Sequence, residues 1–193
     1  MKRIIPLGCA ACQRRSVLRA GLGLLLLPWW STKAKAQDGA TAPPQPGDHF
    51  VHLTGPKEGQ IVKSDDVVLD DLQVQAFPAS PEGVVRNGTP LNLVLLVRVD
   101  SEGVSEETRA HSADGVAAFS GACTHQGCPV SMWSKRHKTL FCSCHGSEFN
   151  PKNGAEVVFG PAPRPLPALP LKSENKVLMV AGPFSSRVWA FGQ

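Results

Sequence analysis

Two short segments decide the fold of this chain: residues 123–128 are Cys-Thr-His-Gln-Gly-Cys, and residues 142–147 are Cys-Ser-Cys-His-Gly-Ser. Each segment offers a cysteine thiolate and a histidine imidazole, which are ligands for tetrahedral zinc and for iron–sulfur clusters. The candidate metal ligands are Cys123, His125, Cys142 and His145. As a donor set alone, two thiolates and two imidazoles would suit structural zinc.

Two further features of these segments favour an iron–sulfur cluster over zinc. Gly127 and Gly146 suit tight loops whose backbone amides can donate hydrogen bonds toward cluster sulfur atoms. Cys128 and Cys144 add one cysteine to each segment and are a natural disulfide pair that would tie the two loops together. Such a bond persists in an oxidising compartment.

The double motif resembles the Rieske family, whose pattern is C-x-H-x-G-C followed by C-x-C-H-G-S. Both segments match this pattern, and 16 residues separate His125 from Cys142. The resemblance implies a [2Fe–2S] cluster with Cys123 and Cys142 on one iron and His125 and His145 on the other. It also implies the Rieske fold, an all-β arrangement of layered antiparallel sheets. In that fold a cluster-binding subdomain, near residues 121–163 here, is inserted into a larger base domain.

The mixed ligand set predicts single-electron transfer. Replacing two anionic thiolates by neutral imidazoles lowers the negative charge of the cluster and makes an added electron easier to accept. Rieske centres accordingly span roughly −150 to +300 mV, against about −400 mV for plant-type ferredoxins. The imidazoles can also keep a proton on their outer nitrogen, so electron gain can be coupled to proton gain. The histidine edge of the site is the expected exit for the electron.

Neighbouring residues are expected to tune the potential. By resemblance, Ser147 occupies the position of a hydroxyl that hydrogen-bonds a cluster sulfur. Quinol-oxidising family members carry a second hydroxyl, on tyrosine, where this chain has Phe149. Residues 160–163, which include Pro161, resemble the proline loop that covers the cluster. We therefore predict a potential in the upper Rieske range, below that of a protein with both hydroxyls.

The rest of the chain has the composition of a loop-rich β domain. Hydrophobic residues make up 42% of the 193 residues, with 17 Pro, 18 Gly and no Tyr. The turn signals at 87–88 and 114–115 separate short apolar runs, and residues 105–110 predict a short helical turn. The apolar runs predict strands at 67–69, 72–77, 91–99, 177–180 and 187–191.

Residues 1–36 carry seven Lys or Arg and no acidic residue, which leaves 13 basic against 16 acidic groups in the remainder. The net charge of +4 therefore belongs to this leader, and it does not indicate nucleic-acid binding.

Arg14 and Arg15 precede an apolar run at 20–30, and residues 34–36 offer a small-x-small cleavage site, as in a twin-arginine signal peptide. The alternative is a retained membrane anchor, although about 11 apolar residues fall short of the ~20 that span a bilayer.

These features predict an exported protein. Residues 37–48 are expected to be a flexible linker and residues 49–193 the Rieske domain, located in the periplasm and membrane-associated only if the leader is retained. A ring-hydroxylating oxygenase needs a second, mononuclear iron site, and no histidine follows His145 to build one. A cytosolic ferredoxin of the same family would lack both the export signal and the extra cysteine pair.

Two classes of exported Rieske protein remain. Residues 118–131 and Glu148-Phe149, together with the leader, resemble the small subunit of arsenite oxidase-type molybdoenzymes. That resemblance implies a molybdopterin-containing large subunit and a c-type cytochrome as partners, with no substrate site in this chain itself. Gly146-Ser147 and the proline loop instead resemble the Rieske subunit of a cytochrome bc-type quinol-oxidising complex. The sequence favours the molybdoenzyme partner, with the bc-type complex as the alternative.

Overall fold

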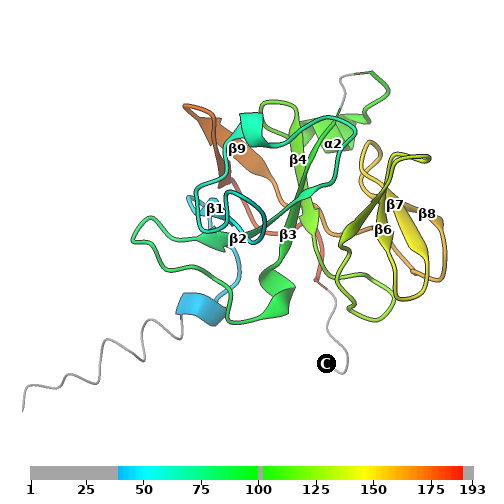
Figure 1. Ribbon diagram of the computed structural model, residues 1–193, viewed down its shortest axis with the longest axis horizontal. Helices are drawn as coiled ribbons and strands as arrows, with labels where there is room; N and C mark the ends of the chain where they lie inside the picture. The colour runs from blue at the N-terminus through cyan, green and yellow to red at the C-terminus, as the bar shows by residue number, and fades with distance from the viewer. Residues whose placement is uncertain (1–38, 100–101, 189–193) are drawn as a thin grey trace, which may run out of the picture.

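The computed structural model describes residues 39–99 and 102–188, and within them it contains two antiparallel sheets (Figure 1). The strands of the larger sheet are β1 (His49–His52), β2 (Val74–Ala79), β3 (Val94–Arg98), β4 (Val116–Ser120), β9 (Leu171–Glu174) and β10 (Val177–Val180). Those of the smaller sheet are β5 (Met132–Ser134), β6 (Thr139–Cys142), β7 (Ser147–Asn150) and β8 (Glu156–Phe159). The short helical elements are η1 (Ser64–Asp66), η2 (Pro90–Asn92) and α2 (Glu106–Ala110).

The strand order shows how the two sheets are connected. The larger sheet has the order β4-β3-β2-β1-β10-β9, and the smaller has the order β5-β6-β7-β8. All four strands of the smaller sheet lie between β4 and β9 in the chain, so this sheet is inserted into the larger one. In Figure 1 it lies to one side of the larger sheet. The predicted all-β fold with layered antiparallel sheets is confirmed.

Strand β3 is buried on both faces and separates two hydrophobic clusters. Leu95 and Val97 point into a cluster shared with Leu140 and Phe149 of the smaller sheet. The alternate residues of β3 point into a second cluster, on the other face of the larger sheet. Burial on both faces of β3 therefore explains why its apolar run is continuous.

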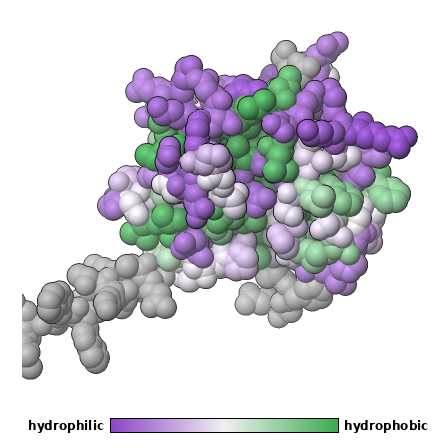
Figure 2. Space-filling view, viewed as in Figure 1, coloured by the Kyte–Doolittle hydropathy of each residue, from purple (hydrophilic) through white to green (hydrophobic). Residues whose placement is uncertain are grey.

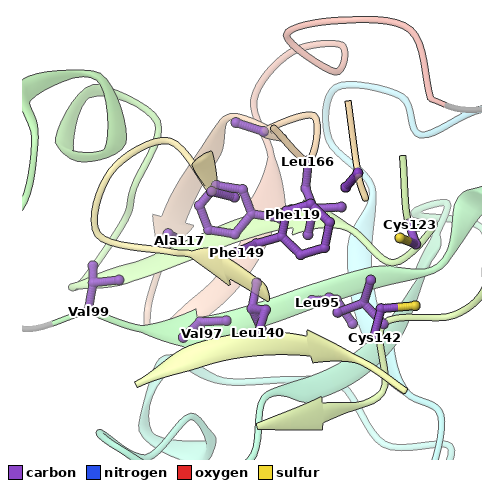
Figure 3. Close-up of a cluster of buried hydrophobic side chains, with 14 residues drawn as sticks. Leu95, Val97, Val99, Ala117, Phe119, Cys123, Leu140, Cys142, Phe149 and Leu166 are labelled. Carbon is purple, nitrogen blue, oxygen red and sulfur yellow. The ribbon is translucent and has the colours of Figure 1, made fainter. Parts of the chain in front are cut away.

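The shared cluster reaches the metal-binding segments. Figure 3 shows the rings of Phe119 and Phe149 side by side, with Cys123 and Cys142 at one side of the cluster. Both cysteines are almost completely buried. Because close-packed interiors hold side chains in fixed positions, the two cysteines are anchored in the rigid part of the molecule.

Three of the predicted strands overlap β2, β3 and β10, and the helical turn predicted at 105–110 is α2. Its N-terminus is capped by Ser105, whose Oγ accepts a hydrogen bond from the Thr108 amide at 3.2 Å. The strand predicted at 67–69 is wrong, because this segment follows η1 and makes one isolated bridge, from Leu69 to Arg98. The strand predicted at 187–191 falls largely outside the described residues.

The leader prediction also lies outside the described residues. Within residues 39–99 and 102–188, no helix has the length and apolar character needed to cross a bilayer.

The Asp66 carboxylate stabilises η1, so we expect the free energy of unfolding to depend on pH. Burial would raise its pKa, but hydrogen bonds from Lys57 Nζ (2.5 Å), the Lys63 amide (2.8 Å) and His52 (3.2 Å) hold it at about 2. Since the folded-state pKa lies below the ordinary value of 3.8, the ionised carboxylate stabilises the fold above that value. We expect Asp66→Asn to lower the free energy of unfolding at neutral pH by about 2 kcal/mol.

The measurement is denaturant unfolding of both proteins between pH 7 and pH 2. The advantage of the wild type should shrink below pH 3.8 and vanish as the pH falls through about 2. Asp65→Asn is the matched control, because Asp65 pairs with Lys176 on the exposed surface, where such pairs contribute little. A difference between wild type and Asp66→Asn that stays constant over this range would contradict the prediction.

Candidate metal centre

The two metal-binding segments fold into loops of the same construction. The Gly127 amide donates to the Cys123 carbonyl oxygen at 2.8 Å, and the Gly146 amide donates to the Cys142 carbonyl oxygen at 3.0 Å. Both glycines have positive φ, 72° and 77°, where an L side chain would be strained. The two glycine amides already donate to carbonyl oxygens of their own loops. Hydrogen bonds to a cluster sulfur would therefore come from other amides of these loops.

The loops bring the two predicted histidine ligands together. The ring centroids of His125 and His145 lie 4.6 Å apart with an interplanar angle of 86°. Nδ1 of His125 is buried and has no hydrogen-bond partner among the described residues. A buried ring nitrogen left without a partner is costly unless a metal or another group takes its lone pair. This nitrogen therefore fits a metal ligand.

The predicted cysteine ligands are also suited to a cation. Burial, with a smaller contribution from the nearby Cys123, raises the pKa of the Cys142 thiol to about 12, even though a hydrogen bond with the Cys144 backbone acts to lower it. A proton is thus held tightly unless a metal replaces it, because a coordinated thiol is deprotonated outright. The donor set is two buried thiols and two neighbouring imidazoles, which fits a mixed-ligand iron–sulfur cluster.

The second pair of cysteines lies between the loops. The sulfur atoms of Cys128, Cys142 and Cys144 all lie within 4.8 Å of one another. The four cysteines of the body are free thiols in this structure. Interaction with Cys144 raises the pKa of the Cys128 thiol, as expected for two sulfur atoms in contact. This proximity suits the Cys128–Cys144 disulfide, which stays a prediction.

The predicted proline loop packs on both cluster loops. Ser147 is fully buried, and its Oγ accepts a hydrogen bond from the Ala162 amide at 3.2 Å, which leaves the hydroxyl hydrogen for another acceptor. Thr124, also fully buried, donates its hydroxyl to the Arg164 carbonyl oxygen at 2.6 Å. Pro161 itself is exposed. The contact made by Thr124 was not predicted from the sequence, where it is only the residue between two ligands.

Phe149 supplies a test of how the potential is tuned. Its ring is fully buried against Leu140 and Phe119, on the face of the smaller sheet that also carries Cys142. We expect Phe149→Tyr to raise the reduction potential in protein-film voltammetry, because a hydroxyl donated toward the cluster stabilises the more negative, reduced state. Phe141→Tyr is the control, since its side chain points to the opposite face of β6. No shift, or a fall, in Phe149→Tyr would defeat the assignment.

Comparison with known proteins identifies the family. The family model described as the Rieske [2Fe-2S] domain matches residues 67–170. This chain belongs to the Rieske family. Its cofactor is therefore a [2Fe–2S] cluster, in agreement with the sequence prediction and with the clustering of cysteine sulfur atoms described above.

Individual relatives are subunits of respiratory complexes. A cytochrome bc1 complex Rieske iron-sulfur subunit from Streptomyces lividans is 28% identical over 141 residues, which are 65% of this chain and 81% of the relative. A putative respiratory nitrate reductase subunit Rieske from Haloferax mediterranei is 36% identical over 118 residues, which are 60% of this chain and 50% of the relative. The bc1 complex subunit from Corynebacterium glutamicum is 39% identical over 102 residues, only 25% of its length.

Solved structures give a weaker similarity. The plasma membrane Rieske protein from Synechocystis PCC 6803 has a TM-score of 0.38 and 27% identity, covering 56% of this chain and 86% of that protein. A hyperthermophilic respiratory complex III chain has a TM-score of 0.40 and 25% identity, covering 61% and 71%.

Proposed function

We propose that Cys123, His125, Cys142 and His145 hold the [2Fe–2S] cluster and that the chain relays single electrons as the Rieske subunit of a respiratory complex. The unpartnered, buried Nδ1 of His125 beside the ring of His145 is the observation that carries this assignment. The cluster supplies the uptake and return of one electron. The membership of the chain in the family supports the same role.

The four proposed ligands differ in how deeply they are buried, so the two sides of the site have different surroundings. Cys123 and Cys142 lie in the hydrophobic core, whereas His145 is exposed and His125 is half-buried. The histidine side therefore faces solvent and the thiolate side faces the protein. An imidazole at the surface can exchange electrons with a docked partner and can hold or release a proton on its outer nitrogen. The thiolates are kept from water by the surrounding core.

We further propose that the complex is of the quinol-oxidising cytochrome bc type, which is the alternative drawn from the sequence. Two of the relatives described above are bc1 complex subunits, and this supports the bc type over the molybdoenzyme partner favoured from the sequence. The packing of the proline loop on Ser147 and Thr124 is consistent with that type. In this proposal the chain works outside the cytoplasm and passes electrons to a c-type cytochrome.

Purification of the tagged chain from membranes of its native host tests the proposal. We expect cytochrome b to co-elute and quinol–cytochrome c reductase activity to disappear when the gene is deleted. Complementation with the wild-type chain should restore the activity, and complementation with Cys142→Ser should not. Co-elution with a molybdenum-containing subunit, with quinol oxidation intact in the deletion strain, would overturn the bc-type assignment.

A further inference from the structure

The stretch from Pro161 to Pro165 has few backbone hydrogen-bond donors of its own. Every second residue in it is proline, which has no N–H to donate. Two side chains of the cluster loops, Ser147 and Thr124, make hydrogen bonds to this stretch. Thr124 donates its hydroxyl to the Arg164 carbonyl oxygen at 2.6 Å. The backbone position of Arg164 therefore decides where this hydroxyl can lie.

The side chain of Arg164 extends to the C-terminal segment, which we define as residues 184–188. Nη2 of Arg164 donates to the Arg187 carbonyl oxygen at 2.8 Å, and Nη1 donates to Ser186 Oγ at 3.4 Å. A guanidinium presents its N–H groups in a rigid fork, so it can hold two acceptors of one segment in a fixed arrangement. Both acceptors are uncharged, so this contact fixes a position without neutralising the charge of the arginine.

The C-terminal segment is itself anchored to the larger sheet. The Ser185 amide donates to the Ala168 carbonyl oxygen at 2.8 Å, and the Ala168 amide donates to Ser185 Oγ at 2.9 Å. Ala168 also forms an isolated bridge with Phe119 of β4. Phe184 packs against the hydrophobic cluster on the other face of the larger sheet. The guanidinium of Arg164 is thereby tied to a fixed part of the molecule.

We propose that Arg164 is a positioning residue for the first cluster loop and that the C-terminal segment supports the cluster through it. Thr124 is fully buried and lies between the proposed ligands Cys123 and His125, so a shift of the Arg164 backbone moves the loop that carries both. Amides of this loop can donate toward a cluster sulfur only while the loop keeps its orientation. Such bonds raise the potential because they stabilise the reduced state. The inference rests on the proposed ligand set and adds a support that lies outside both motifs.

Protein-film voltammetry of Arg164→Gln tests this support. Glutamine lacks the fork that holds two acceptors, so we expect a lower reduction potential than in the wild type. In excess chelator the cluster absorbance should also be lost about threefold faster, the size expected when one or two hydrogen bonds near the surface are lost. A reduced-state EPR signal in each variant shows that the cluster is loaded.

Arg109→Gln is the matched control for the loss of one positive charge. Nη2 of Arg109 also donates to a carbonyl oxygen near the surface, that of Val104 at 3.4 Å. Its helix, α2, precedes β4, whereas the first cluster loop follows β4. Helix α2 lies at the upper edge of Figure 1, and Figure 2 shows strongly hydrophilic side chains along most of that edge. We expect this control to keep the potential and the rate of cluster loss of the wild type.

Ser185→Ala separates positioning from charge. This variant loosens the C-terminal segment by removing the acceptor of the Ala168 amide, and it leaves every charged group in place. We expect the potential to fall, as in Arg164→Gln, and the cluster to be lost faster. If Arg164 acted through its charge alone, Ser185→Ala would match the wild type.

A double-mutant cycle with Thr124→Val tests the path from Arg164 to the cluster. Valine keeps the branched shape of threonine and removes the hydroxyl that bonds to the Arg164 carbonyl oxygen. If Arg164 acts through this hydroxyl, Arg164→Gln should lower the potential much less in the Thr124→Val background than in the wild type. Residues that act through one shared contact have non-additive effects of this kind.

Three results would overturn the inference. The first is a wild-type potential in Arg164→Gln, and the second is a wild-type potential in Ser185→Ala beside a fall in Arg164→Gln. The third is strict additivity of Arg164→Gln and Thr124→Val. By contrast, a wild-type protein that contains zinc and gives no reduced-state EPR signal would refute the proposed function itself.

Discussion

Replacing Cys142 by serine is expected to abolish the mixed-ligand EPR signal and the visible absorbance of the purified protein. The Cys142 side chain is almost completely buried at the end of β6, so water cannot easily take its place as a ligand. A neutral hydroxyl is a poor ligand for iron compared with a thiolate. The buried hydroxyl would also be left without the metal that satisfies the native sulfur, which adds an energetic cost.

The measurement is iron content, absorbance and EPR of protein purified under identical conditions. Cys128→Ser is the comparison, because it removes a thiol of the same cluster of sulfur atoms that we do not assign as a ligand. We expect this variant to retain at least part of the EPR signal. A full signal in Cys142→Ser would show that the cluster is held by another set of side chains.

The candidate ligands could be predicted from the sequence because the cysteine and the histidine of each pair lie two or three positions apart in the chain. Local spacing decides which side chains a tight loop can bring together. The positive φ of Gly127 and Gly146 shows that both loops are tight turns. The contacts that hold the loops in place join residues that are far apart in the sequence. The bond from Thr124 to Arg164 spans 40 positions, and no spacing rule connects them. Contacts of this kind depend on how the proline loop folds back, which the sequence pattern does not specify.

The strands also divide into those that a local sequence pattern predicts and those that it does not. Long apolar runs such as the one in β3 were predicted because burial on both faces leaves a continuous signal. Strands β5 to β8 have three or four residues each, too few for a period of two to be recognised. Residues 67–69 have the composition of a strand, yet only Val67 is buried there, while Val68 and Leu69 are exposed. Strand propensity alone was therefore misleading.

Substitution of Gly160 is expected to undock the proline loop. Its φ is +90°, and a Cβ built on it would lie 2.6 Å from Ser147 Cα, 2.7 Å from the Gly146 carbonyl oxygen and 2.8 Å from the Ser147 amide nitrogen. All three neighbours are backbone atoms of the second cluster loop, so none can rotate out of the way. The left-handed conformation costs an L residue about 1–2 kcal/mol, and overpacking costs about 1–3 kcal/mol more.

We therefore expect Gly160→Ala to lower the free energy of unfolding by about 3 kcal/mol and to hasten the loss of cluster absorbance in denaturant. Gly182→Ala is the matched control, because the Cβ of its alanine would meet the nearest atom at an ordinary 3.7 Å. If the loop moves away, Ser147 loses the Ala162 amide at its Oγ and water gains access to that side of the cluster. The reduction potential of the surviving holoprotein should then change as well, since solvent exposure and hydrogen bonding both set it. Wild-type stability and potential in Gly160→Ala would mean that the loop does not pack on the cluster-binding strand, because the clash is with backbone and cannot be relieved by a side-chain rotation.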